Sequence, residues 1–482
     1  MVMLEGLDST KVFEYFEEIS NIPRGSGNNT AISNYLVDFA KAHNLKYRKD
    51  QAENIIIWKD ASKGCETKET VILQGHMDMV CEKEEDSNHD FTKDSLELCV
   101  DGDVIYAKGT TLGGDDGIAI AYALAILDDD TLVHPPLEVV ITTDEETGMF
   151  GAEALDCSDL KGKYFINIDS EEEGTILTSC AGGARVDARF SIGKLKKEGY
   201  VMTAKLTGLQ GGHSGTEINK NRENAVYMLG RLMTALKHRK VDFRLMNIQG
   251  GQKDNAIPRS AEMELLMFDL EEAKKNVMEI VHELEQEMES SEKDANFSVT
   301  FSEKQKVDII DENVTRKINI FMELMPNGVQ RMSAAIPGLV ESSLNLGICK
   351  SDEHEVRFSY SLRSSKKSYK EYMKNKLKDL IKEVGGVFET YGDYPAWEYR
   401  ADSKLRDVMV QVYKDQYGNE PKIEAIHAGL ECGIVSGKMP ELDMVSIGPD
   451  TFDIHTTKER LSISSTKRVY RFLLTVLERL CD

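Results

Sequence analysis

Residues 137–148 read LEVVITTDEETG, an apolar run that ends in two adjacent glutamates, Glu145 and Glu146. A short apolar run rich in β-branched residues predicts a buried strand. Similar runs occur at 53–58 (ENIIIW), 70–80 (TVILQGHMDMV) and 163–169 (KYFINID), and a helix-like stretch, DDGIAIAYALAILDDD, occupies residues 115–130. Strands that alternate with helices are typical of an α/β domain.

The texture of the sequence changes at about residue 184. From there, long charged helical stretches such as 270–289 (LEEAKKNVMEIVHELEQEME) alternate with strands such as 356–363 (VRFSYSLR). After about residue 392 the α/β texture returns. We therefore predict a catalytic α/β domain, with a mostly parallel central sheet flanked by helices, formed by residues 1–183 and 393–482. An inserted α+β lid domain, residues 184–392, interrupts it.

The composition argues against several classes of protein. The formal charge of −24 disfavours nucleic acid and anionic membranes as partners, because both require a basic surface. The N-terminal segment does not read as a signal peptide, and no window has the length of an apolar membrane span. The eight cysteines occur singly, without a CxxC pair, which indicates neither a disulfide framework nor a cysteine zinc site. We therefore expect a cytoplasmic enzyme with reduced thiols.

Polar side chains follow several of the predicted strands. In an open α/β sheet, the carboxyl ends of the strands border the crevice in which ligands bind. The side chains in question are His76 and Asp78, two apart and so on one face, then Asp115, Asp116, Glu145, Glu146, Asp169 and the late His455. Each has an ordinary explanation when taken alone: a hydrogen-bonded scaffold histidine, an aspartate that caps a helix, a solvent-facing glutamate, or an aspartate in a turn.

Taken together, these residues predict a metal site. Several carboxylates in one cleft repel one another unless cations neutralise them. Histidine with aspartate and glutamate, and without cysteine, suits zinc, manganese or cobalt better than magnesium. Two ions that share one bridging carboxylate could hold a water, lower its pKa and polarise a carbonyl. One of the adjacent glutamates would bind metal, and its neighbour would stay free as the general base.

A series of motifs then points to a known family. QGHMDMV, GTTLGGDDGI, TTDEETG, NIDSEEEG, GLQGGHSG, NAIPR, SLRSS, HAGLECG and a late histidine occur in family order between residues 74 and 461. This series resembles the aminoacyl-histidine dipeptidases (peptidase D, beta-alanyl-histidine dipeptidase) of the dinuclear zinc aminoacylase and carboxypeptidase superfamily. HxD and DEE are shared across the superfamily, whereas GTTLGGDDG and HAGLECG are typical of this branch.

The resemblance implies a complete metal site. His76 and Asp169 would bind one ion, Glu146 and His455 the other, and Asp115 would bridge both. Asp78 would brace the imidazole of His76 and fix its tautomer. Glu145 would be the base that activates the water. Asp116 replaces the asparagine expected after the bridging aspartate, which adds a carboxyl group beside the metals.

The resemblance also implies residues that act on the substrate. His213 would stabilise the developing oxyanion, although it could instead belong to a simple glycine-rich turn. Asn255 and Arg363 would hold the substrate, with Arg363 suited to a terminal carboxylate; the alternatives are a turn residue and a surface ion pair. Gly429 lies in a backbone-exposing loop, HAGLECG, near the substrate's C-terminal end, where His427 and Glu431 could serve only to orient the loop.

These expectations lead to a metal-dependent dipeptidase that hydrolyses unblocked dipeptides, including Xaa-His types, with two divalent ions. Two alternatives remain open: an N-acyl-amino-acid deacylase with the same metal chemistry, and a non-catalytic binding member of the family. The family further implies a homodimer and a lid domain that closes over the cleft.

Overall fold

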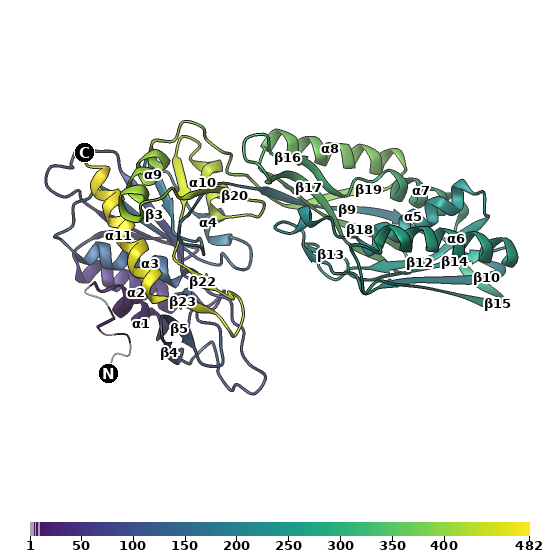
Figure 1. Ribbon diagram of the computed structural model, residues 1–482, viewed down its shortest axis with the longest axis horizontal. Helices are drawn as coiled ribbons and strands as arrows, with labels where there is room; N and C mark the ends of the chain where they lie inside the picture. Colours follow the sequence, from purple (N-terminus) through teal and green to yellow (C-terminus); the bar gives the residue numbers. More distant parts are fainter. Residues whose placement is uncertain (1–3, 5, 8–9) are drawn as a thin grey trace. The chain divides into compact units, whose positions relative to one another are not determined.

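The computed structural model describes residues 4, 6–7 and 10–482 (Figure 1). Residues 1–3, 5 and 8–9, part of the N-terminal segment considered for a signal peptide, lie outside the described residues. The chain forms two compact units. Unit 1 comprises the described part of Met1–Cys180 together with Trp397–Ala425 and Leu430–Asp482, and unit 2 comprises Ala181–Ala396 and Ile426–Gly429. No helix in the described part of the chain has the length and hydropathy needed to cross a membrane.

Unit 1 is built on an eight-stranded sheet with the order β1-β2-β6-β3-β7-β21-β8-β20. Its strands are β1 (Lys46–Lys49), β2 (Ile55–Lys59), β3 (Val71–His76), β6 (Leu137–Thr142), β7 (Tyr164–Asn167), β8 (Thr175–Cys180), β20 (Lys422–Ile426) and β21 (Asp443–Ser446). The four central strands, β6, β3, β7 and β21, run parallel. The pairs β1/β2, β2/β6 and β21/β8 are antiparallel. The predicted α/β class is therefore confirmed, and parallel pairing is concentrated at the centre.

The register of the central strands aligns their carboxyl ends. His76 at the end of β3 is paired with Thr142 at the end of β6. Gln74 on β3 is paired with Asn167 on β7, which in turn is paired with Ser446 on β21. Because parallel strands end at the same edge of a sheet, the residues that follow β3, β6 and β7 are delivered to one place.

Helix α3 (Gly114–Asp128) carries Asp115 and Asp116 in its first turn. Its remaining residues are almost all apolar and buried, so the helix lies inside unit 1. A buried helix needs partners for the carbonyl groups of its last turn. The Lys59 ammonium, itself buried, donates to the carbonyls of Ile126 (3.0 Å), Leu127 (3.1 Å) and Asp129 (2.9 Å). A cation at this end also complements the helix dipole.

Further elements complete unit 1. Its other helices are α1 (Val12–Ser20), α2 (Thr30–Ala42), α4 (Phe150–Ala154), α9 (Lys404–Tyr417), α10 (Glu431–Lys438) and α11 (Ile463–Arg479). A small antiparallel sheet has the order β22-β23-β5-β4, with β22 at Thr451–Phe452, β23 at Arg460–Ser462, β5 at Val104–Ala107 and β4 at Leu98–Asp101. One apolar core joins α1, α2, α3, α9 and α11 to the main sheet.

Unit 2 is an α+β structure with its own apolar core. Its large antiparallel sheet has the order β15-β10-β14-β12-β17-β18-β9-β19, with β16 paired to β17. The strands are β9 (Gly182–Ser191), β10 (Lys194–Thr207), β12 (Phe243–Gly250), β14 (Ala261–Met267), β15 (Asn296–Ile310), β16 (Gly328–Met332), β17 (Val340–Ser351), β18 (Glu355–Ser364) and β19 (Val387–Tyr394). Helices α5 (Ala225–His238), α6 (Leu270–Met288), α7 (Glu312–Leu324) and α8 (Lys367–Glu383) pack against this sheet. A short ladder pairs β11 (Gly212–His213) with β13 (Ala256–Ile257), and a 3-10 helix spans Ile218–Lys220.

Candidate metal centre

The first group of candidate ligands gathers around His76, the last residue of β3. Its Nε2 atom lies 3.1 Å from Oδ1 of Asp115 and 3.6 Å from Oδ1 of Asp169. Asp169 follows β7 by two residues, and Asp115 comes from the first turn of α3. The His76 side chain is buried, and its Nε2 atom faces both carboxylates.

The second group gathers around His455, in the loop between β22 and β23. Its Nε2 atom lies 3.0 Å from Oδ2 of Asp115 and 3.0 Å from Oε1 of Glu146. Ligand atoms of these three residues all lie within 4.8 Å of one another. His455 has a left-handed backbone (φ 59°), a conformation that non-glycine residues adopt rarely.

Asp115 belongs to both groups through different oxygens. Oδ1 is beside His76, and Oδ2 is beside His455. A carboxylate that presents one oxygen to each of two His and carboxylate sets has the arrangement of a bridging ligand. The donor set is nitrogen and oxygen alone, which fits zinc and its borderline neighbours.

The protonation of the carboxyl groups also favours cations at this place. Burial raises the pKa of Asp169 to about 6, although the hydrogen bond and charge of His76 act in the opposite direction. Burial likewise raises the pKa of Glu145 and of Asp116 well above the usual range. So many buried carboxyl groups can all be ionised only if positive charge is placed among them.

Asp78 links His76 to the turn of the two glutamates. One of its oxygens lies 3.4 Å from His76 Nδ1 and accepts the backbone N–H of Glu145 (3.0 Å). The other accepts the backbone N–H of Glu146 (3.3 Å) and the Ser26 hydroxyl (2.8 Å). Asp78 therefore orients a candidate ligand and the strand end that follows β6. Glu145 and Glu146 each bring a carboxylate oxygen within 4.8 Å of His76.

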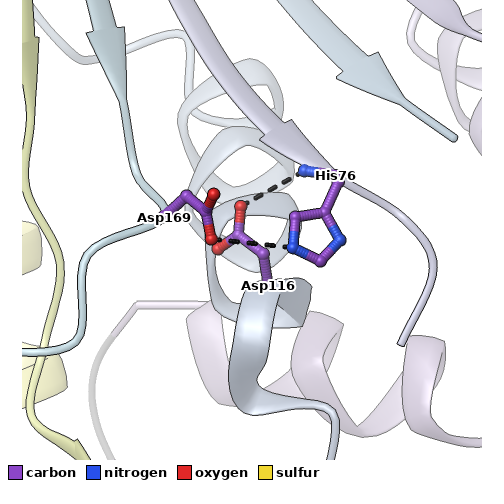
Figure 2. Close-up of side chains that lie close together, drawn as sticks. All are labelled: His76, Asp116 and Asp169. Atoms are coloured by element: carbon purple, nitrogen blue, oxygen red, sulfur yellow. Dashed lines mark hydrogen bonds and ion pairs between the residues drawn. The ribbon is translucent and has the colours of Figure 1, made fainter. Parts of the chain in front are cut away.

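Asp116 lies against the first group, as Figure 2 shows. Its Oδ2 accepts the backbone N–H of His76 (3.2 Å), and its side chain converges with those of His76 and Asp169. The peptide bond between Asp115 and Asp116 is cis. Burial raises the pKa of Asp116 well above its usual value, which favours the neutral form of this carboxyl.

Comparisons with known proteins identify the family of this chain. The model of peptidase family M20/M25/M40 matches residues 72–479. The chain belongs to this family. The cytosol non-specific dipeptidase of Escherichia coli (strain K12) is 36% identical over 484 residues, which cover 100% of this chain and 99% of the relative.

Solved structures agree with this assignment. The aminoacylhistidine dipeptidase from Vibrio alginolyticus is 33% identical, with a TM-score of 0.92 and 99% of both chains covered. The aminopeptidase PepT from Bacillus cereus, with a TM-score of 0.58 over 98% of both chains, is 15% identical and shows a common fold only. The resemblance to the aminoacyl-histidine dipeptidases that the motifs indicated is confirmed.

The four substrate-binding and oxyanion candidates all belong to unit 2 of this peptidase. His213 on β11 is paired with Ala256 on β13, directly after Asn255. Arg363 on β18 donates from Nη1 to the hydroxyl of Tyr394 (3.2 Å). Gly429 also approaches Tyr394, because a Cβ atom at this glycine would lie 2.9 Å from the tyrosine ring.

The positive charge of Arg363 affects two histidines of unit 2. Burial and the charge of Arg363 lower the pKa of His213. Burial, Arg363 and His213 lower the pKa of His427 to about 3. His427 Nε2 lies 2.7 Å from the hydroxyl of Ser343, while its buried Nδ1 has no hydrogen-bond partner among the described residues. Sequence reasoning missed Ser343 and Tyr394, since neither stands in a motif with a chemical signature.

A polar layer that sequence reasoning also missed lies beneath the ligands of unit 1. Oε2 of Glu431, at the start of α10, accepts from the Gln74 side chain and from the Thr142 hydroxyl (2.6 Å). Gln74 in turn accepts from the Asn167 amide (2.7 Å). Glu431 is fully buried, and burial raises its pKa to about 7. These side chains connect the last residues of β6 and β7 to Gln74, two residues before the end of β3.

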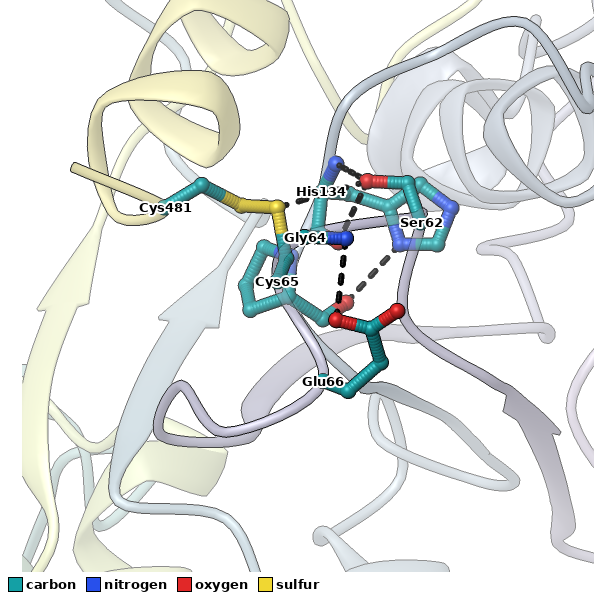
Figure 3. The surroundings of a disulfide bond; sticks show 7 residues. Ser62, Gly64, Cys65, Glu66, His134 and Cys481 are labelled. Carbon is teal, nitrogen blue, oxygen red and sulfur yellow. Dashed lines mark hydrogen bonds between the residues drawn. A yellow bond between two sulfur atoms is a disulfide. The ribbon is translucent and has the colours of Figure 1, made fainter.

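The cysteines do not take part in the candidate ligand groups among the described residues. The expectation of reduced thiols is wrong for one pair, because Cys65 and Cys481 form a disulfide with Cα atoms 5.3 Å apart (Figure 3). The two cysteines are 416 positions apart in the sequence, and only the fold brings the end of the chain to the loop near Ser62. No local spacing could have indicated this bond.

Proposed function

We propose that this peptidase is a metal-dependent dipeptidase that hydrolyses unblocked dipeptides, including Xaa-His types, at a centre of two divalent ions. The observation that carries the proposal is Asp115, whose two oxygens face two different histidines, His76 and His455. Each histidine has a further carboxylate beside it, Asp169 or Glu146. The relatives from Escherichia coli and Vibrio alginolyticus, both dipeptidases, support the substrate class.

The ligand assignment follows from the two groups. His76 and Asp169 would hold one ion, Glu146 and His455 the other, and Asp115 both. Zinc suits the nitrogen and oxygen donors, and manganese or cobalt could replace it. When bound, the ions would supply Lewis acidity, polarising the scissile carbonyl and lowering the pKa of the attacking water.

The remaining residues of unit 1 would handle protons and orientation. Glu145 would take the proton from the attacking water and deliver it to the leaving nitrogen. Its pKa, raised well above the usual range by burial, suits a carboxyl that must hold a proton between these two steps. Asp78 would keep the His76 imidazole in one tautomer, because it lies beside Nδ1 and leaves Nε2 for the ion.

The residues of unit 2 would act on the substrate. His213, whose pKa is lowered by burial and by the charge of Arg363, would donate an N–H to the oxyanion. Arg363 would bind the terminal carboxylate of the dipeptide through its planar guanidinium. Asn255 and the backbone at Gly429 would hold the peptide on either side.

A panel of free dipeptides and their N-acetylated forms tests the proposed function. The zinc-loaded protein should cleave free dipeptides, should leave the N-acetylated forms intact, and should lose activity with a chelator. Cleavage of N-acyl amino acids in place of free dipeptides would instead identify a deacylase. Metal binding without hydrolysis of any member of the panel would identify a non-catalytic binding protein.

We also propose a cytoplasmic location and a homodimeric assembly. The similarity to the Escherichia coli relative, a cytosol dipeptidase, supports a cytoplasmic location. A homodimer follows from the family resemblance, and light scattering of the purified protein measures it directly. A monomeric mass at working concentration would contradict the homodimer.

A further inference from the structure

Glu459 stands out among the buried carboxylates of unit 1. It lies four residues after His455 and is 3% exposed. Its Oε2 accepts the backbone N–H groups of Leu112 (2.7 Å) and Gly113 (3.0 Å). Its Oε1 accepts those of Gly114 (2.8 Å) and Asp115 (3.3 Å). Four consecutive N–H groups, ending with that of the candidate bridging ligand, therefore point at one carboxylate.

These N–H groups belong to the turn that leads into α3, where Gly113 is left-handed and Asp115 and Asp116 have non-helical backbone angles. Successive backbone N–H groups in such a turn form a concave site that favours an anion. A residue more than 340 positions away in the sequence thus supplies the acceptor for the turn that carries Asp115. Hydrogen bonds to an ionised acceptor are the stronger kind, so the turn is held firmly.

Arg24 fixes the same turn from another direction. Its guanidinium is buried and donates from Nη1 to the carbonyls of Met77 (3.1 Å) and Asp78 (3.3 Å). Its Nη2 donates to the carbonyl of Gly113. Arg24 therefore ties the segment after His76 to the turn before Asp115, while Glu459 ties that turn to the loop of His455.

The loop of His455 depends on this anchor. It connects β22 to β23, and Glu459 is its last residue, immediately before β23. His455 is the most exposed of the candidate ligands, with 45% of its side chain accessible. Metal ligands must be placed to within a few tenths of an ångström, and an exposed loop does not achieve this by itself.

We propose that Glu459 is a positioning residue that holds the His455 loop and the Asp115 turn at a fixed separation. The ion position formed by Asp115, Glu146 and His455 then exists before metal arrives. This inference rests on the proposed two-ion centre. Partners of this kind around metal sites typically change metal affinity by about 10- to 100-fold when they are removed.

Glu459→Gln removes the charge and turns an amide N–H group toward the backbone N–H groups. Glu138→Gln is a matched control, because Glu138 is also a buried carboxylate of unit 1 that accepts backbone N–H groups, from Lys161 (3.0 Å) and Gly162 (3.0 Å). Glu138 lies near the start of β6, at the end of the strand opposite to Glu145 and Glu146. Both variants should lose some stability, but only Glu459→Gln should bind metal more weakly.

The experiment is a zinc titration of metal-free wild type and of both variants against a chromophoric competitor, alongside thermal unfolding of the metal-free proteins. We expect two ions on the wild type and on Glu138→Gln with equal affinities. Glu459→Gln should retain its first ion and bind the second at least about tenfold more weakly. If Glu459→Gln does not fold, Glu459→Asp, which keeps the charge but reaches fewer N–H groups, should show a smaller loss at the same ion.

Two results would overturn the inference alone. Glu459→Gln could bind two ions with wild-type affinities, or its loss of affinity could be matched by Glu138→Gln in proportion to lost stability, which would make Glu459 a purely structural residue. Wild-type protein that binds fewer than two ions would overturn the proposed function, and the inference with it.

Discussion

Replacing Glu431 by glutamine should stabilise the metal-free protein at alkaline pH and not at acidic pH. The fully buried carboxyl keeps one oxygen hydrogen-bonded to Gln74 and Thr142, while Oε1 has no partner among the described residues. A glutamine preserves the accepting oxygen and has the same shape. Burial raises the pKa of Glu431 from 4.5 to about 7, which makes the ionised form costly in the folded state.

The magnitude follows from the two pKa values. A folded-state pKa of about 7 against an ordinary value of 4.5 corresponds to about 3 kcal/mol. Because the pKa is raised on folding, the contribution to stability is fully present below pH 4.5 and is lost as the pH rises through about 7. The free energy of unfolding of Glu431→Gln minus that of wild type should therefore increase by about 3 kcal/mol between pH 4.5 and pH 8.5.

Urea unfolding followed by tryptophan fluorescence, with a chelator present, measures this difference. Both tryptophans, Trp58 and Trp397, belong to unit 1, so the signal reports the unit that contains Glu431. Glu153→Gln on α4 is a control, because this glutamate is exposed and solvent surrounds its carboxylate in both states. A constant difference between Glu431→Gln and wild type across this pH range would refute the reasoning.

Three other substitutions test separate parts of the molecule. His213→Ala should lower kcat by about 10²- to 10³-fold with unchanged bound metal, measured by steady-state kinetics and elemental analysis; loss of metal would show that its role is wrongly assigned. Arg363→Lys should raise KM for dipeptides by about tenfold or more, because a lysine cannot form the two parallel bonds to a carboxylate, and an unchanged KM would place that carboxylate elsewhere. Lys59→Met should destabilise unit 1 by about 2 kcal/mol in the tryptophan-monitored urea assay, because three carbonyls at the end of α3 lose a charged donor; an unchanged midpoint would mean that water caps them equally well.

Much of unit 1 could be predicted because short stretches of its sequence indicate their own secondary structure. The apolar runs before His76, Glu145 and Asp169 are short and bounded by polar residues, as buried parallel strands are. Parallel strands end at one edge of a sheet, so the sequence alone predicts that these side chains meet. The antiparallel pairing of β1, β2 and β8 was missed, since an apolar run does not reveal the direction of its neighbour.

The contacts that fix the candidate site in place could not be predicted in the same way. Glu459 meets the Asp115 turn across more than 340 residues, and Glu431 meets Gln74 across 357 residues. In sequence, a glutamate that faces solvent cannot be distinguished from one that accepts hydrogen bonds from four backbone N–H groups. The segment 426–429, which groups with unit 2 although its neighbours belong to unit 1, likewise carries no local signal.

The central claim is that two ions bound between His76 and His455 act together with Glu145 as the base. Metal content and dipeptide turnover, measured on the same preparations of wild type and Glu145→Gln, test it most directly. We predict about two divalent ions on both proteins and a loss of about 10²- to 10⁴-fold in kcat for the variant. A variant that keeps its activity would contradict the role of Glu145, and a wild-type protein without bound metal would contradict the two-ion centre itself.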